Sequence, residues 1–185
     1  MKLDLKEIYN DYLTEINSIN KSNYQAKNPN KYYRASSAGH CFKKHWYAIN
    51  GYEVGDMNDK SRRLLRLGTI VHRDIEKAVN WHEDRLSCDV NNEYNVSFTT
   101  EYEVLIKDLN VMGSADIVLI DSEKTASVLD VKTTHSWKWK MMFGRNKEIK
   151  PSRMYELQLG TYGMGVSLQE DISHEDMSLF LVYYK

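Results

Sequence analysis

Three apolar segments follow one another in the second half of the chain, separated only by short polar connections. Residues 96–106, 112–121 and 126–133 are rich in β-branched and other apolar residues, each in a run of strand length. Between the last two, residues 121–125 are polar and few enough for a hairpin turn. Because parallel strands need a much longer crossover, this pattern predicts a three-strand antiparallel meander.

Two of these predicted strands carry a carboxylate between apolar residues. Asp116 lies in Gly-Ser-Ala-Asp-Ile-Val, and Asp130 lies in Val-Leu-Asp-Val-Lys-Thr. A charge in such a setting is costly unless something pairs with it, and a divalent cation is the obvious partner. Side chains repeat every two residues along a strand, so Asp130 and Lys132 should share one face near Asp116. The competing interpretation is a solvent-facing pair of Asp130 and Lys132, with Asp116 as a turn residue.

These residues predict a hard-oxygen site for Mg²⁺ or Mn²⁺, formed by Asp116, Asp130 and the backbone carbonyl of Val131. Lys132 would hold or polarise an attacking water, as in a metal-dependent phosphodiesterase site. Cys41 and Cys88 are too few for a disulfide scaffold or for a four-cysteine iron–sulfur cluster, and we expect both thiols to be reduced.

A long helix is predicted over residues 61–83. Its buried face should carry His72 together with Leu64, Leu67, Val71, Ile75 and Val79. An imidazole suits Mn²⁺ and tolerates Mg²⁺, so we expect His72 to be a further ligand, the alternative being a satisfied core histidine. Gly68, one turn earlier, would let the helix approach the sheet closely. Glu76, one turn later, either supports the metal ligands or is a surface acid.

Helices are also predicted before and after the meander. Apolar spacing predicts a first helix over residues 5–19, with a loop over 22–31. Ser36 and Ser37 are expected to cap a helix over 38–49, and a further helix should run over 151–166. A last strand is predicted over 177–184, and residues 135–149 fit a loop or a short helix. This order favours an α/β fold with a central sheet flanked by helices.

On the helix over 151–166, Gln158 and Tyr162 are four residues apart and project together. We expect Gln158 to orient Lys132 or the water, and Tyr162 to contact a substrate phosphate. Periodicity alone would make both of them partly buried positions of an amphipathic helix.

Two local segments are basic although the formal net charge is only -1. Any nucleic-acid binding must therefore rest on patches rather than on bulk charge. One segment, over residues 31–47, has no acid, and its predicted DNA contacts are Arg34, Ser36, Lys43 and Lys44. The other follows the last meander strand, and its predicted contacts are Trp137, Lys138, Trp139, Lys140 and Arg145. The alternative for the second segment is a hydrophobic flap over the core, with a DNA strand entering past the first.

This combination resembles the RecB-like branch of the PD-(D/E)XK nuclease superfamily. The pieces that match, in the family's order, are Arg34 to Lys44, Gly68-Thr69-Ile70-Val71-His72, Gly113-Ser114-Ala115-Asp116, Leu129-Asp130-Val131-Lys132-Thr133 and Tyr155-Glu156-Leu157-Gln158-Leu159-Gly160-Thr161-Tyr162. The resemblance implies a restriction-endonuclease-like core over residues 31–185, preceded by an N-terminal helix and loop over 1–30, in one nuclease domain.

The resemblance also implies roles for individual residues. His72, Asp116, Asp130 and the Val131 carbonyl would bind the metal, Lys132 would be the catalytic lysine, and Gln158 with Tyr162 would form the family's Q-x-x-x-Y element. Asp130 stands where many relatives have Glu, which the family tolerates. CRISPR adaptation nucleases and AddB-type exonuclease domains carry an iron–sulfur cluster that this chain lacks the cysteines to hold.

The expected function is therefore a Mg²⁺- or Mn²⁺-dependent deoxyribonuclease, foremost an exonuclease on single-stranded DNA or DNA ends. The alternatives are a structure-specific endonuclease of the same fold and a DNA-end binding or assembly module with an inactive nuclease fold. A zinc-structured interaction protein would use His40, Cys41, His45, His82 and Cys88, whose spacing is poor for that purpose.

Location and partners follow from the same features. No helicase motif is present, so a helicase or recombination protein would act in trans. The charged N-terminus and the lack of long apolar runs predict a cytoplasmic protein, in bacteria or a phage-infected host, without a signal peptide or membrane contact.

Overall fold

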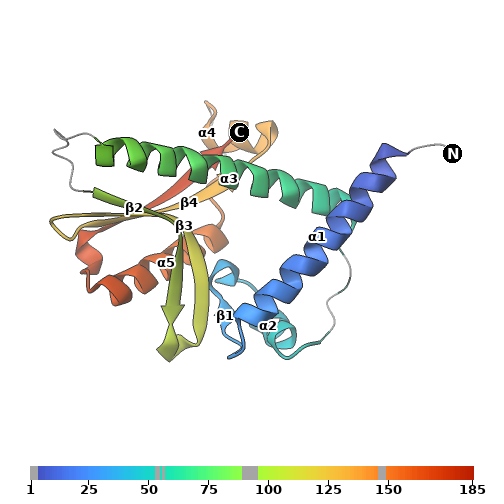
Figure 1. Ribbon diagram of the computed structural model, residues 1–185, viewed down its shortest axis with the longest axis horizontal. Coiled ribbons are helices and arrows are strands. Elements are labelled where there is room, and N and C mark those ends of the chain that lie inside the picture. Colours follow the sequence, from blue (N-terminus) through green and yellow to red (C-terminus); the bar gives the residue numbers. More distant parts are fainter. Residues whose placement is uncertain (1–3, 53–54, 56, 89–95, 146–148) are drawn as a thin grey trace.

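Among the residues that the structure describes, a mixed sheet of five strands forms the centre of the protein (Figure 1). The structure is a computed structural model and describes residues 4–52, 55, 57–88, 96–145 and 149–185. Over these residues the elements are α1 (Leu5–Lys27), β1 (Tyr33–Arg34), η1 (Ala35–Ser37), α2 (Phe42–Ile49), α3 (Asp59–Cys88), β2 (Val96–Ile106), η2 (Lys107–Leu109), β3 (Val111–Asp121), β4 (Ala126–Thr133), α4 (Ser136–Phe143), α5 (Arg153–Glu170), η3 (His174–Asp176) and β5 (Met177–Tyr184). The predicted α/β class, a meander plus a further strand flanked by helices, is confirmed.

The strands β2, β3 and β4 form the predicted antiparallel meander, and β5 lies parallel to β4. On its other edge β3 has two short partners in succession. The strand β1 pairs in parallel with Val111 and Met112, and β4 pairs with residues 117–120. The sequence did not predict β1, because two residues are too short for a periodic signal. Between these two partners, the edge of β3 is open at Asp116.

Helices α3 and α5 cover opposite faces of the sheet (Figure 1). The core beneath α5 contains Val104, Ala115, Val118, Val128, Leu159, Tyr162 and Val166. Gly163 and Gly165 let α5 approach closely, because a Cβ on Gly163 would lie 2.7 Å from Leu179 and one on Gly165 would overlap Val104. This close packing fixes α5 against β2 and β5, and thereby the side chains that α5 presents to β4.

Helix α3 is longer than predicted and extends beyond the sheet. Its 30 residues span about 45 Å, and its N-terminal end lies past the strands, toward α1 (Figure 1). Val71, Ile75 and Val79 are therefore half-buried over the sheet, but Leu64 and Leu67, predicted on the same buried face, are exposed.

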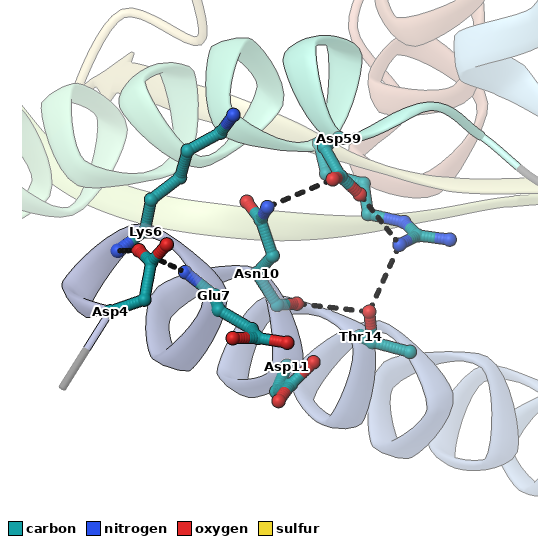
Figure 2. A pocket seen from close by; sticks show the side chains of 8 residues that line it. Asp4, Lys6, Glu7, Asn10, Asp11, Thr14 and Asp59 are labelled. Atoms are coloured by element: carbon teal, nitrogen blue, oxygen red, sulfur yellow. Dashed lines mark hydrogen bonds and ion pairs between the residues drawn. The ribbon is translucent and has the colours of Figure 1, made fainter. Parts of the chain in front are cut away.

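The N-terminal part of α3 meets α1 through polar contacts. Figure 2 shows the pocket between them, in which Asn10 donates to Asp59 Oδ2 at 2.8 Å and Arg62 donates to Thr14 Oγ1 at 2.9 Å. Arg63 also donates to Asn10 Oδ1 at 2.6 Å. Each of these side chains has a partner, so we interpret the pocket as the joint between the two helices.

Two predicted boundaries near the N-terminus are wrong. Helix α1 continues to Lys27, into the predicted loop, because Asn28 closes its end by bonding the Tyr32 backbone and the Tyr24 hydroxyl. Residues Ser36 and Ser37 belong to the turn η1 and cap no helix; α2 begins only at Phe42, after Gly39 turns the chain with a φ of +80°.

Candidate functional site

The strands β3 and β4 separate where the predicted site residues begin. Their pairing ends at Ile117 and Leu129, and beyond this point the backbone N–H of Val131 donates to Asp116 Oδ2 at 2.6 Å. A carboxylate thus takes the place of a backbone carbonyl in the ladder. The separation brings the Asp116 side chain beside the Asp130-Val131-Lys132 segment, as the sequence predicted.

Asp130 is the centre of a hydrogen-bonded network between β4 and α5. Its side chain is only 1% exposed, and Lys132 Nζ lies 2.7 Å from its Oδ2 and 2.9 Å from its Oδ1. Gln158 Nε2 donates to the same Oδ1 at 3.1 Å and to the Tyr162 hydroxyl at 3.0 Å, while its Oε1 accepts from Lys132 at 3.3 Å. The expectation that Asp130 and Lys132 share a face is confirmed, and the solvent-facing alternative is wrong.

Tyr162 has a different position from the one expected. It is 3% exposed and its hydroxyl accepts from Gln158, so it is buried behind Gln158 and holds that side chain in place. Tyr155, one turn before Gln158, lies with the Nζ atoms of Lys132 and Lys138 at 5.0 and 5.3 Å from its ring centroid. The lysine therefore lies among an amide, a carboxylate and an aromatic face.

Burial raises the pKa of the Asp130 carboxyl, and the bond to Lys132 opposes this by favouring the charged form. The Oδ2 atom is buried and accepts no geometrically good hydrogen bond from the described residues, although Lys132 Nζ lies close to it. In this arrangement the Lys132 ammonium therefore provides the positive charge beside the buried oxygen.

His72 reaches the site from α3. Its Nδ1 lies 3.4 Å from Asp116 Oδ1, and the hydrogen bond with this carboxylate raises the pKa of the imidazole. Gly68 does not have the role expected of it, because a Cβ there would meet only Thr133 Oγ1 at an ordinary 3.5 Å. The helix therefore approaches the sheet closely enough for His72 without requiring glycine one turn earlier.

Glu101 on β2 is a residue that the sequence did not predict. In the β2–β3 register it falls between the pairs Thr100–Ile117 and Tyr102–Ala115, level with Asp116. It accepts a hydrogen bond from Ser114 Oγ at 2.5 Å and has a φ of +52°. Burial, followed by the charge of Glu101 and a hydrogen bond with it, raises the pKa of Glu76 on α3. Glu76 is therefore close to the Glu101 carboxyl group and near Asp116.

Glu101 also changes which face of the sheet its neighbours occupy. Phe98 and Thr100 contact His82 and Asn80 of α3, whereas Tyr102 bonds Glu170 of α5. In a regular strand these three alternate residues would share a face. The left-handed Glu101 therefore reverses which residues of β2 face α5. The facing of β3 residues reverses at the same level, as shown by Ala115 and Val118, which are three residues apart and both lie in the core beneath α5. This double reversal coincides with the turn of Asp116 toward His72.

The donor types present fit a hard divalent cation. Asp116 and Asp130 offer carboxylate oxygens, His72 offers an imidazole nitrogen, and Val131 lies between the two acids with its N–H on Asp116. In this arrangement the carboxylates are engaged by protein donors, and within the described residues no three His, Cys, Asp or Glu side chains are close enough together to hold a metal ion. Binding would require Asp116 or Asp130 to exchange one of these protein partners for the ion.

The segment after β4 contains a short helix, α4, capped by the His135 side chain. Trp137 is exposed and stacks on His135, but Trp139 packs on Phe143, which packs in turn on Tyr183 of β5. Part of the predicted aromatic contact surface therefore serves packing. Lys138 lies beside the site, with its Nζ over the ring of Tyr155, while Lys140 and Arg145 are exposed.

The first basic segment lies on the surface, with Arg34, Ser36, Lys43 and Lys44 exposed. The zinc alternative gains no support: His40 and His45 lie with ring centroids 6.0 Å apart, but His82 packs on Phe98 of the sheet. The Cys88 side chain is outside the described residues.

No protein-family model matches the chain, no curated protein is significantly similar to it, and no solved structure matches it significantly. Within the described residues, no helix is long and apolar enough to cross a membrane.

Proposed function

We propose that the protein is a Mg²⁺- or Mn²⁺-dependent deoxyribonuclease with a restriction-endonuclease-like core, similar to the RecB-like branch of the PD-(D/E)XK nucleases. The observation that carries the proposal is the network at Asp130, in which a buried carboxylate, the lysine two residues later and Gln158 of α5 contact one another. Asp116, held between His72 and the Val131 N–H, lies on the neighbouring strand. These are the D…D-x-K residues and the glutamine that the resemblance singles out.

Asp116, Asp130, His72 and the Val131 carbonyl would hold the cation. A cation bound there would lower the pKa of a water and neutralise charge on the phosphate. Lys132 is positioned by Asp130 and Gln158 so that its ammonium group can orient that water or stabilise the developing negative charge. Tyr162 is buried behind Gln158 and accepts its hydrogen bond, so its role is to position Gln158.

The proposed substrate is single-stranded DNA or a DNA end, and the proposed setting is the cytoplasm, with a helicase or recombination protein as a partner in trans. The test is cleavage of end-labelled linear and circular DNA, single- and double-stranded, with Mg²⁺ or Mn²⁺. Cleavage of linear substrates alone supports an exonuclease, and cleavage of circles supports the endonuclease alternative.

Two site variants and one matched control make this test specific. Asp116→Asn and Asp130→Asn remove one charge each and should abolish cleavage, whereas Asp108→Asn changes an exposed acid of η2 and should leave it intact. Binding of DNA ends without cleavage by the unaltered protein would replace the enzyme with a binding module. Cleavage that survives both site substitutions would refute the site.

A further inference from the structure

Helix α2 carries an exposed aromatic cluster that the proposed chemistry does not use. Trp46, Tyr47 and Tyr52 contact one another with ring centroids 5.0 to 5.9 Å apart. Phe42, one turn before Trp46, packs on Tyr33 of β1 and is still 66% exposed. Four large aromatic residues on one short helix and its following turn are more than a monomer surface needs, and none of the four is buried.

The surroundings of this cluster are basic. From Lys31 to Tyr52 the chain has four Lys or Arg residues and no acid. Lys43 Nζ lies 5.8 Å from the Tyr47 ring centroid, and Arg34 lies 3.6 Å over the ring of Tyr24. Aromatic faces interleaved with cations recognise a chain that offers stackable rings and a negative backbone together. A single-stranded nucleic acid has both.

The segment that leads into the cluster packs on the elements that carry the candidate site. Ala35 of η1 packs on Gly113, where a Cβ would lie 2.7 Å from the alanine, three residues before Asp116. Gly39 packs on Met154 and Leu157 of α5, the residues adjacent to Tyr155 and Gln158. The segment leading into α2 therefore contacts both elements that hold the site.

We propose that Phe42, Trp46, Tyr47 and Tyr52 form a stacking platform for single-stranded DNA, with Arg34 and Lys43 contacting its phosphates. The proposal rests on the proposed function for its substrate class and adds where the strand binds. Because every base has a π-face, the platform should be insensitive to sequence, and its contribution should disappear for a strand without bases.

The experiment measures binding of a labelled oligothymidylate, and of an abasic strand of equal length, by fluorescence anisotropy in EDTA, where no cleavage occurs. Trp46→Ala should weaken oligothymidylate binding at least about fivefold, and Trp46→Phe should restore most of it. Binding of the abasic strand should be unchanged by both substitutions.

Trp81→Ala is the matched control, because Trp81 is 59% exposed on α3 with the Arg85 guanidinium 4.9 Å from its ring centroid. It should bind both strands as the unaltered protein does. Urea unfolding reveals whether Trp46→Ala disturbs the fold. Tyr52→Ala, which removes another ring of the cluster, should also weaken oligothymidylate binding and provides the test in that case.

Equal affinity of the Trp46 and Tyr52 variants for oligothymidylate would overturn the platform, as would an equal loss on the abasic strand. If these variants instead differed from the unaltered protein in sedimentation coefficient but not in DNA affinity, the platform would also be overturned. The cluster would then be a contact between copies of the chain. Cleavage assays separate the two proposals. A protein that does not cleave but binds through Trp46 retains the platform without the nuclease, whereas one that cleaves without needing Trp46 for binding retains the nuclease alone.

Discussion

Replacing Lys132 by methionine tests how far the Asp130 carboxylate depends on its partner for stability. The carboxylate is almost completely buried, and the ammonium lies within 2.9 Å of both its oxygens. Removing one member of a buried ion pair costs about 3–5 kcal/mol, because the remaining charge is left uncompensated. Gln158 still donates to Oδ1, so we expect the low end of this range, about 3 kcal/mol.

The assay is urea unfolding in EDTA, followed by tryptophan fluorescence. The double variant Lys132→Met with Asp130→Asn removes the buried charge as well and should lose less than about 1 kcal/mol. Such losses are measurable against the roughly 5–15 kcal/mol of a typical domain. A single variant within about 0.5 kcal/mol of the unaltered protein at neutral pH, or a double variant as unstable as the single, would refute the reasoning.

The pH dependence of the single variant gives a second check. Burial raises the folded pKa of Asp130, and replacing Lys132 removes the hydrogen bond and the charge that most oppose that rise, leaving the charge of His72. A carboxyl with a raised folded pKa stabilises the fold below its unfolded pKa, near 3.9, and this stabilisation is lost as pH rises through the folded value. The deficit of the Lys132 variant should therefore shrink as pH is lowered.

Three further predictions concern the scaffold. Gly160→Ala should raise the free energy of unfolding by up to about 1 kcal/mol, since a Cβ there meets nothing. Gly165→Ala should lower it by about 1–3 kcal/mol, because its Cβ would overlap Val104. Thermal unfolding compares the two variants, and equal midpoints would contradict the packing of α5. Glu101→Gly should stabilise the protein in EDTA by relieving the left-handed conformation and the repulsion of neighbouring carboxylates, and a lower urea midpoint would contradict this. Hydrogen bonds in the β3–β4 turn lower the pKa of Asp121, so the stability that this carboxylate adds is present above its unfolded pKa and is lost as pH falls through the folded pKa. Asp121→Asn should therefore make stability depend less on pH in acid, and an unchanged acid-unfolding curve would rule this out.

The meander and the Asp130 network could be predicted because they depend on short-range pattern. Apolar, β-branched runs of strand length and a five-residue connection specify antiparallel neighbours, and the two-residue offset of Asp130 and Lys132 specifies one face. Helical spacing predicted only that Gln158 and Tyr162 project together, because the contacts of Gln158 with Asp130 and Lys132 depend on how α5 packs on β4. These signals are local in the sequence, so they survive whatever the rest of the chain does.

Glu101 and the exposed part of α3 could not be predicted for the opposite reason. The left-handed conformation of Glu101, with a φ of +52°, is imposed by its surroundings. Buried and exposed residues alternate over 98–106 as in a regular strand, so the sequence carries no signal of the irregularity. Leu64 and Leu67 have core-like spacing, but the sheet ends before their part of the helix. The buried position of Tyr162 likewise depends on how closely α5 packs, which Gly163 and Gly165 determine.

The bond from the Val131 N–H to Asp116 means that one carboxylate completes both the β-ladder and the candidate site. A ligand that took this oxygen would leave a backbone donor unsatisfied, at a cost of about 1–3 kcal/mol. Ligand affinity and strand pairing therefore compete for the same atom. The Val131 amide is consequently a built-in reporter, whose hydrogen exchange should quicken when the Asp116 oxygen is engaged elsewhere, so occupancy could be followed in solution without any substrate.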